Sequence, residues 1–365
     1  MPFNARTLAL PATIPFVGPE ALERRLGRPF LARLGANEST FGPSPLVVEA
    51  MSRAARDSWA YGDPEHHALR EAIAAHVGIR FEEVVVGEGI DGLFGLLTQI
   101  VLEPGDRVVT SLGAYPTFNY HVTGHGGTLD FVPYRDDRED IDALIERMRE
   151  VRPKLVYFAN PDNPTGSWHE ADAVRRLMDA VPEGTLLVLD EAYSDLAPAS
   201  ALPAASEIRP NVLRFRTFSK AYGMAGVRVA FVFGAAETVA HFHKVRNHFG
   251  VSRMAQAGAL AALGDQAYLA DVVGRIVRAR SRLEEIAATA GLRALPSATN
   301  FVAIDCGRDG TYARRILEGV LEHQVFIRMP GVAPLDRTIR VTVGRDDELD
   351  RFALALDASL SRAEG

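Results

Sequence analysis

Short apolar runs rich in β-branched residues alternate with stretches of helical periodicity through the middle of this chain. This alternation limits the possible folds more than any other feature. Helical stretches such as 139–151 and 169–181 separate most of the runs. Strands that are apolar along their whole length and separated by helices indicate a parallel sheet buried on both faces. The predicted strands are 83–86, 107–110, 154–158, 186–189, 212–216 and 228–233.

The character of the sequence changes after residue 265. An arginine-rich helical stretch, 265–290, leads into NFVAIDC and then into VFIRM and TIRVTVG. We expect these segments to form a smaller α+β domain. The N-terminal fifty residues are too few for a core of their own and are expected to pack with it. The predicted organisation is an N-terminal arm with part of the small domain at 1–50, a large domain at 51–270 and a small C-terminal domain at 271–365.

Composition excludes several classes of function. The 365 residues carry a formal net charge of −7 without a long basic run, so nothing favours nucleic acid as a partner. The lone Cys306 excludes an intramolecular disulfide framework and a multi-cysteine metal site, and we predict no metal. No apolar run approaches the roughly 18–20 residues of a spanning helix, and the start does not resemble a signal peptide. We expect a soluble, cytoplasmic protein without a membrane partner, with Cys306 in its core.

The stretch VVVGEGIDGLFGLL at 84–97 contains G-x-G-x-x-G, formed by Gly87, Gly89 and Gly92. A dinucleotide site also needs an acidic residue about 20 positions further on, at the end of the next strand. Here that strand ends in TSLG, without a carboxylate. A glycine-bearing turn from strand to helix still presents backbone N–H groups to a single phosphate. A tight turn without a ligand and a dinucleotide site are the alternatives.

Three further stretches carry groups suited to chemistry. RFRTFSKAYGMAGVRVAFVF contains a Ser-Lys pair with an arginine eight residues after the lysine. FANPDNPTG places an asparagine in a proline-rich turn, and LLVLDEAYSDL ends a buried strand with an aspartate. Each has an ordinary structural explanation by itself, as a turn or a helix cap. The residues concerned are Asn163, Asp190, Tyr193, Thr217, Ser219, Lys220 and Arg228.

In this order, the stretches resemble the fold-type I pyridoxal-phosphate aminotransferases of class I/II, and most of all the histidinol-phosphate aminotransferase group. The resemblance covers nearly the whole chain, from LGANESTFGPSP to TIRVTVG, and TFSKAYGMAGVR is its most specific part. It implies an α/β fold. A large domain has a mainly parallel, seven-stranded sheet between helices, and a smaller α+β domain comes from the N- and C-terminal segments.

The resemblance implies that pyridoxal 5′-phosphate is the cofactor. Lys220 is expected to form a Schiff base with the cofactor aldehyde and, once released, to move a proton between the substrate Cα and the cofactor C4′. Asp190 is expected to pair with the pyridinium nitrogen. Asn163 and Tyr193 are expected to hydrogen-bond the phenolic oxygen. Lys220, Asp190 and Tyr193 form the predicted catalytic set.

The same resemblance assigns the remaining contacts of cofactor and substrate. Tyr115 is expected to stack on the ring face. Two arginines match anion-binding positions, and a guanidinium can bind a carboxylate or phosphate through two hydrogen bonds. The 5′-phosphate is expected to bind at Gly89, Ile90 and Asp91, with Thr217, Ser219 and Arg228 completing its cup. Tyr61 is expected to reach this phosphate from the neighbouring subunit of a homodimer. Arg340 and its helper Arg328 are expected to hold the substrate anion, and Asn37 to lie near the substrate mouth.

This chain departs from the family pattern at several positions. Phe16 stands where a tyrosine is usual, Gly92 where an acidic residue is common and Gly250 where asparagine is frequent. Ser39-Thr40 replaces Asn-Pro, and Val229-Ala230 ends the arginine motif. None of these changes removes a group of the cofactor chemistry. All of them leave the natural substrate open.

The leading hypothesis is a homodimeric aminotransferase that moves an amino group between an anionic amine and a 2-oxo acid, 2-oxoglutarate first. Histidinol phosphate is the first choice of amine, and an aromatic or other amino acid is the second. A decarboxylase of the threonine-phosphate type is the alternative, because it shares this cofactor site and differs in which bond at Cα stands perpendicular to the ring. A nucleotide-dependent oxidoreductase would instead bind nicotinamide. A non-catalytic binding module would leave Lys220 and its partners without a role.

Overall fold

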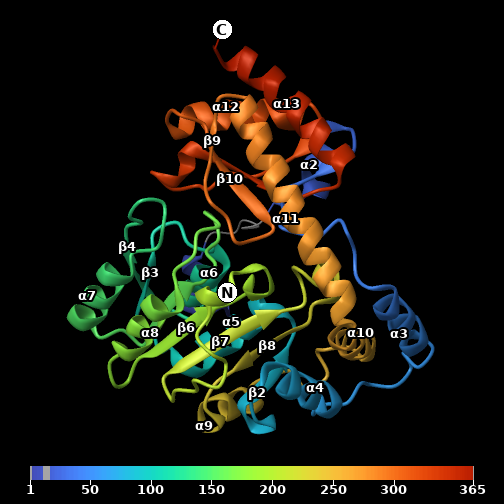
Figure 1. The fold of residues 1–365 in the computed structure, drawn as a ribbon. Helices are drawn as coiled ribbons and strands as arrows, with labels where there is room; N and C mark the ends of the chain where they lie inside the picture. The colour runs from blue at the N-terminus through green and yellow to red at the C-terminus, as the bar shows by residue number, and fades with distance from the viewer. Residues whose placement is uncertain (1, 11–16, 365) are drawn as a thin grey trace.

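The computed structural model describes residues 2–10 and 17–364. In the view of Figure 1, a lower body surrounds one large sheet and an upper body contains two small ones. The long helix α11 (Gln266–Thr289) runs from one body to the other. The predicted helical stretch 265–290 is therefore confirmed. The domain limits at residues 50 and 270 stay predictions.

The large sheet has seven strands in the order β2-β8-β7-β6-β5-β3-β4. Its paired strands are parallel except at β8, which runs antiparallel to both of its neighbours. The strand β2 lies at an edge and pairs with β8. The predicted α/β fold with a mainly parallel, seven-stranded sheet is confirmed. The strands are β2 (Val84–Gly87), β3 (Arg107–Ser111), β4 (Thr128–Val132), β5 (Leu155–Ala159), β6 (Leu186–Asp190), β7 (Val212–Thr217) and β8 (Ala230–Phe233).

All six predicted strands form, and β4 is the strand of this sheet that the sequence did not reveal. It lies at the opposite edge from β2, and its side chains are only partly buried. Asp130 interrupts its apolar residues and accepts hydrogen bonds from Arg107 and Arg147. An edge strand with a solvated side lacks the continuous apolar run by which the central strands were recognised.

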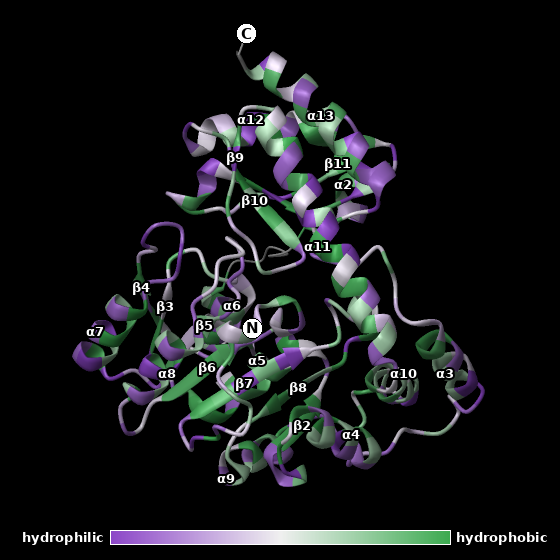
Figure 2. Ribbon diagram, viewed as in Figure 1, coloured by the Kyte–Doolittle hydropathy of each residue, from purple (hydrophilic) through white to green (hydrophobic). Residues whose placement is uncertain are grey.

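Helices cover both faces of the large sheet, whose strands are mainly hydrophobic in Figure 2. On one face, Leu144 of α7 and Leu177 of α8 are fully buried against the strands. On the other, Phe94 of α5 and Phe118 of α6 pack with Tyr157 of β5. The helices of this body are α3 (Pro45–Ala55), α4 (His67–Val77), α5 (Gly89–Val101), α6 (Pro116–Gly124), α7 (Ile141–Val151), α8 (Ala171–Asp179), α9 (Ala236–Val239) and α10 (Arg253–Gly264), with 3₁₀ turns at Phe81–Glu83, Ser194–Leu196, Ala199–Ala201, Ala225–Val227 and Ala240–Lys244.

The upper body combines segments from both ends of the chain. Strand β1 (Ala32–Arg33) pairs in parallel with β11 (Val325–Phe326). A second, antiparallel sheet has the order β12-β10-β9. The remaining elements of this body are α2 (Pro19–Leu26), β9 (Arg293–Ala294), β10 (Phe301–Asp305), α12 (Gly310–Glu322), a 3₁₀ turn at Leu335–Arg337, β12 (Thr338–Thr342) and α13 (Asp346–Glu364). Helix α1 (Ala5–Ala9) lies on the N-terminal segment outside this body, and its Arg6 donates to the His125 backbone oxygen of the lower body at 3.0 Å.

The register of the parallel strands brings their carboxyl ends to one edge. Ala159 of β5 lies opposite Asp190 of β6, which lies opposite Phe215 of β7. The turns after these three strands therefore meet at the same place. Open sheets of this kind bind their ligands at the carboxyl ends of the strands.

Within residues 2–10 and 17–364, no helix has the length and apolar character needed to cross a membrane. The same residues contain no group of three or more His, Cys, Asp or Glu side chains arranged to hold a metal ion. Cys306 is buried in the core of the upper body, as predicted.

Candidate active site

A cavity of about 630 Å³ lies at the carboxyl ends of β5, β6 and β7, and residues of both bodies line it. It brings together groups that are far apart in the sequence, with Lys220 among them. The predicted site residues in its wall are Asn37, Ile90, Asp91, Tyr115, Asn163, Asp190, Tyr193, Thr217, Ser219, Lys220, Arg228, Arg328 and Arg340.

Lys220 follows β7, and its Nζ donates a hydrogen bond to the backbone oxygen of Asn37 at 3.1 Å. Burial lowers the pKa of Lys220 to about 8, and the positive charge of Arg340 acts in the same direction. A lowered pKa leaves more of the amine neutral near pH 7, and the neutral amine is the nucleophile. The cavity therefore favours the neutral form of this amine.

Asp190 ends β6 with a buried carboxylate. Its Oδ2 accepts a hydrogen bond from the Tyr157 hydroxyl at 2.7 Å, and its Oδ1 accepts one from the Ala192 backbone N–H at 2.9 Å. Burial raises the pKa of Asp190 to about 6, although both hydrogen bonds act to lower it. A buried carboxylate held by neutral donors suits a cationic group of a ligand in the cavity.

Backbone, hydroxyl and guanidinium groups form a cradle at the N-terminus of α5. Gly89 begins the helix with a φ of +78°, and a Cβ there would lie 2.3 Å from Nη2 of Arg228. The guanidinium therefore packs directly on the glycine. The hydroxyls of Thr217 and Ser219 are hydrogen-bonded to each other at 3.0 Å. A helix N-terminus beside an arginine and two hydroxyls is suited to a phosphate.

The other two glycines of the G-x-G-x-x-G pattern have different surroundings. A Cβ at Gly87 would lie 2.5 Å from the side chain of Leu93, so this glycine permits close packing of the helix on the strand. A Cβ at Gly92 would lie 3.3 Å from the Glu88 Cβ. The arrangement matches a single-phosphate cradle at Gly89.

Arg328 and Arg340 lie side by side at the end of the cavity that the upper body forms. Their backbones pair with each other, with the Arg340 backbone N–H donating to the Arg328 backbone oxygen at 2.6 Å. Nη1 of Arg340 donates to the Asn163 side chain, and its Nη2 donates to the Gly35 oxygen at 3.2 Å. Burial lowers the pKa of Arg328 to about 10, and the positive charge of Arg340 lowers it in addition. Two adjacent guanidiniums favour an anion between them.

Tyr61 lies outside this cavity. Its side chain is 77% exposed and its ring lies 4.5 Å from that of Phe249. Nη2 of Arg253 donates to the backbone oxygen of Tyr61 at 2.7 Å, and Nε2 of Gln256 donates to the backbone oxygen of Asp63 at 3.1 Å. Arg253 and Gln256 therefore hold the backbone of the loop that carries Tyr61, whereas the Tyr61 side chain is exposed.

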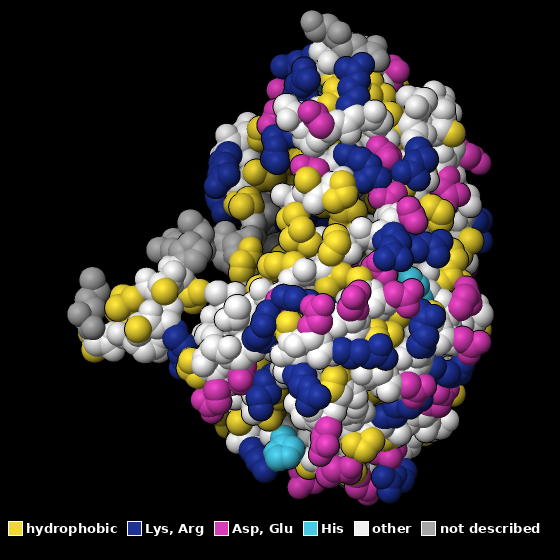
Figure 3. All heavy atoms as spheres, turned by 90° about the vertical axis from the view of Figure 1, so that its left-hand side faces the viewer, with side chains coloured by type: hydrophobic (Ala, Val, Ile, Leu, Met, Phe, Trp, Pro, Cys, Tyr) yellow, Lys and Arg dark blue, Asp and Glu magenta, His cyan; other side chains and the backbone are white. Residues whose placement is uncertain are grey.

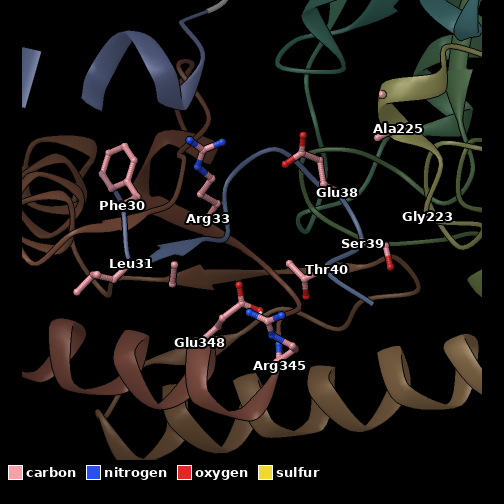
Figure 4. Close-up of a pocket in the computed structure, with 12 residues that line it drawn as sticks. Phe30, Leu31, Arg33, Glu38, Ser39, Thr40, Gly223, Ala225, Arg345 and Glu348 are labelled. Carbon is pink, nitrogen blue, oxygen red and sulfur yellow. The ribbon is translucent and has the colours of Figure 1, made fainter. Parts of the chain in front are cut away.

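A second cavity, of about 480 Å³, lies beside the first (Figure 4). Glu38, Ala225 and Gly226 line both cavities. In the second, the guanidinium of Arg345 lies 3.5 Å from the carboxylate of Glu348. Acidic and basic side chains are thus mixed along its wall. We assign the chemistry to the first cavity, where the lysine, the buried carboxylate and the cradle converge.

A model of the family described as aminotransferase class I and II matches residues 31–356. The chain belongs to the class I and II aminotransferases. The histidinol-phosphate aminotransferase 1 of Mesorhizobium japonicum is 37% identical over 336 residues, which are 90% of each chain. A crystal structure of histidinol-phosphate aminotransferase from Sinorhizobium meliloti in complex with pyridoxal-5′-phosphate has a TM-score of 0.96 and 52% identity, covering 99% of this chain and 98% of that one. Thermus thermophilus aspartate aminotransferase with maleate, at 24% identity, a TM-score of 0.80 and coverage of 98% and 99%, shares the fold. The predicted family is confirmed.

The structure explains one departure of this aminotransferase from the family pattern. A Cβ at Gly250 would lie 1.2 Å from Oε1 of Glu88, so the glutamate fills the space that an asparagine side chain would need. Phe16 lies outside the described residues. The hydroxyls of Ser39 and Thr40 are buried and lack a hydrogen-bond partner within the described part of the chain. We find no structural reason for Val229-Ala230 in place of the usual ending.

Sequence reasoning missed three polar residues that hydrogen-bond to predicted site residues of this aminotransferase. Tyr157 lies within a continuous apolar strand, where a tyrosine reads as part of the core, yet its hydroxyl contacts Asp190. Asn300 and Thr342 contact Asn37 from the upper body. No local pattern marks these two residues, because their partner is far away in the sequence.

Proposed function

We propose that this aminotransferase uses pyridoxal 5′-phosphate to transfer the amino group of histidinol phosphate to 2-oxoglutarate. The convergence of Lys220, Asp190 and the Gly89 cradle on one cavity carries the proposal. The relatives named histidinol-phosphate aminotransferase, and the Sinorhizobium meliloti complex with this cofactor, support it.

The residues present fit the cofactor at each of its three functional ends. The cradle at Gly89, with Arg228, Thr217 and Ser219, is suited to its phosphate. The Asp190 carboxylate is suited to its ring nitrogen, which is cationic when protonated. Lys220 offers an amine of lowered pKa to its aldehyde. When bound, pyridoxal phosphate supplies a ring that accepts electrons from the substrate Cα.

The side chains of this enzyme then orient the substrate and move its proton. The paired guanidiniums of Arg340 and Arg328 bind the substrate's anionic group through charge-assisted hydrogen bonds. Nζ of Lys220 takes the proton from the substrate Cα and later releases it. Asp190 would supply the negative charge for the ring nitrogen, and the hydrogen bonds that Tyr157 and Ala192 donate to its two oxygens favour the charged carboxylate. Tyr115, in the cavity wall, would cover the ring.

The first experiment is a visible spectrum of the purified protein with added pyridoxal phosphate, before and after addition of histidinol phosphate. We expect a visible band that histidinol phosphate abolishes, and glutamate formation when 2-oxoglutarate is present. A response to other amino acids alone would contradict the substrate. Release of carbon dioxide from threonine phosphate would favour the decarboxylase, and the absence of any band would refute the cofactor.

The lysine can be identified with little ambiguity. The chain contains three lysines, Lys154, Lys220 and Lys244. Borohydride reduction of the loaded protein, followed by peptide mass mapping, is expected to leave the cofactor on Lys220. Lys220→Ala is expected to lose the label, whereas Lys244→Ala, an exchange near a surface histidine, serves as the matched control. A label on Lys154 or Lys244 would contradict the assignment.

We also infer a homodimer in which Tyr61 completes the partner's phosphate cup. Trp59, two residues before Tyr61, is 87% exposed, and the exposed rings of Tyr61 and Phe249 lie against each other with centroids 4.5 Å apart. Exposed apolar side chains that gather on one surface mark an interaction site. The N-terminal segment projects from the body with hydrophobic side chains on it (Figure 3), among them Phe3 and Leu8. Sedimentation is expected to give twice the chain mass of 39.7 kDa. A monomer at micromolar concentration would contradict the inference.

A further inference from the structure

Asn37 contacts both the lysine and the tyrosine of the site. Its backbone oxygen accepts from Nζ of Lys220 at 3.1 Å, and its Nδ2 donates to the Tyr193 hydroxyl at 2.9 Å. It is 2% exposed and has a φ of 55°, a left-handed conformation that asparagine tolerates better than most residues. One residue therefore determines where two reactive groups lie.

Asn300 holds the backbone of Asn37 from the upper body. Its Nδ2 donates to the Asn37 backbone oxygen at 3.0 Å, so this oxygen accepts hydrogen bonds from both Asn300 and Lys220. Asn300 is 0% exposed, and its Oδ1 has no hydrogen-bond partner among the described residues. A buried, unsatisfied amide oxygen costs about 1–3 kcal/mol. An apolar side chain would avoid that cost, but it could not donate to Asn37.

Thr342 holds the other side of Asn37. Its Oγ1 accepts from the Asn37 backbone N–H at 3.0 Å and donates to the Asn37 Oδ1 at 3.2 Å. With Oδ1 occupied in this way, the amide nitrogen is turned toward Tyr193. Because the Tyr193 oxygen accepts from Asn37, its own proton is left to point elsewhere. Thr342 lies opposite Phe301 in the β10–β12 register, and Asn300 directly precedes Phe301 in the sequence. The two residues that hold Asn37 therefore lie at the same end of one small sheet.

We propose that Asn300 and Thr342 are positioning residues of the transfer reaction, which fix Asn37 and through it the Lys220 amine and the Tyr193 hydroxyl. The inference rests on the proposed function. Neither residue lines the cavity, so neither touches the substrate or cofactor. Their loss is therefore expected to lower kcat while leaving KM in place. A displacement of about 1 Å at a reacting group costs about a hundredfold in rate.

The decisive variant is Thr342→Val, which keeps the shape of the side chain and removes both hydrogen bonds. We expect kcat with histidinol phosphate to fall by about tenfold to a hundredfold, with KM changed by less than about twofold. The pH midpoint of the visible band of the loaded protein is expected to move, because the surroundings of Lys220 change. Thr342→Ser retains the hydroxyl and is expected to restore both values.

Thr338→Val is the matched control. Thr338 is buried on the same strand, and its hydroxyl donates to the Leu335 oxygen at 2.8 Å, away from Asn37. We expect it to leave kcat and the pH midpoint unchanged. Asn300→Leu removes the other brace and tests the inference independently if Thr342→Val does not fold. Wild-type values in both Thr342→Val and Asn300→Leu would overturn it, as would an equal loss in Thr338→Val. A wild-type protein without the visible band would instead overturn the proposed function itself.

Discussion

Replacing Glu191 with glutamine is expected to lower the free energy of unfolding by about 3–5 kcal/mol. Glu191 directly follows the last residue of β6 and is 0% exposed. Its Oε1 accepts from Nε and Nη2 of Arg214 at 2.9 and 2.6 Å, and its Oε2 accepts from Nε of Arg216 at 2.8 Å. Burial acts to raise the pKa of Glu191, but the two arginines outweigh it and the pKa is lowered. The carboxylate is therefore the anion between two cations of β7.

The magnitude follows from what glutamine retains. Its carbonyl oxygen can still accept from Arg214, although without charge. Its amide NH₂ replaces Oε2 and faces the N–H of Arg216, so a donor meets a donor. A hydrogen bond to a charged group contributes about 1.5–3 kcal/mol. The loss of one such bond and the weakening of two others agree with the effect of removing one partner from a buried ion pair.

Guanidinium-induced unfolding, followed by circular dichroism at one protein concentration, measures the difference. Fixed concentration matters because subunit association would add to the stability. Glu207→Gln is the matched control, since Glu207 also binds an arginine, Arg175, but near the surface. Exposed pairs contribute little. If Glu191→Gln loses no more stability than Glu207→Gln, the argument from burial is wrong.

Two further predictions concern the cofactor site. Gly89→Ala places a Cβ 2.3 Å from the Arg228 guanidinium and is expected to weaken cofactor binding by about tenfold or more, which an absorbance titration measures. Gly105→Ala is the control, because Gly105 also has a positive φ, of +92°, but has open space where a Cβ would lie. Equal cofactor affinities of the two variants would refute the crowding argument. The rate of cofactor attachment to the cofactor-free protein is expected to rise with pH and to level off above about 8, because Lys220 reacts as the neutral amine and is protonated below its pKa. A midpoint near the ordinary lysine value of 10.5 would show that the cavity does not lower this pKa.

The central strands could be predicted, and the residues that the fold brings to the cavity could be named, because their signals are local. A continuous apolar run such as 154–158 can be recognised from a few residues, and Lys220 lies in a motif that fixes its neighbours. The brace on Asn37 has no such signal. Asn300 and Thr342 lie 263 and 305 residues from it along the chain, and only the folded upper body brings them there. The same holds for Gly250, whose reason is the side chain of Glu88.

The order of the large sheet also has a consequence for how the chain is made on the ribosome. Strand β2 is synthesised first of the seven, but its partner β8 begins only at Ala230, roughly 140 residues later. At about 5–20 residues per second, an apolar strand waits about 7–30 s with an unpaired edge. Gly89 lies two residues after the end of β2, and Arg228 lies two residues before the start of β8. The phosphate cradle is therefore completed only when this late pairing closes the sheet, so a nascent chain cannot be held together by its cofactor while β2 is most exposed.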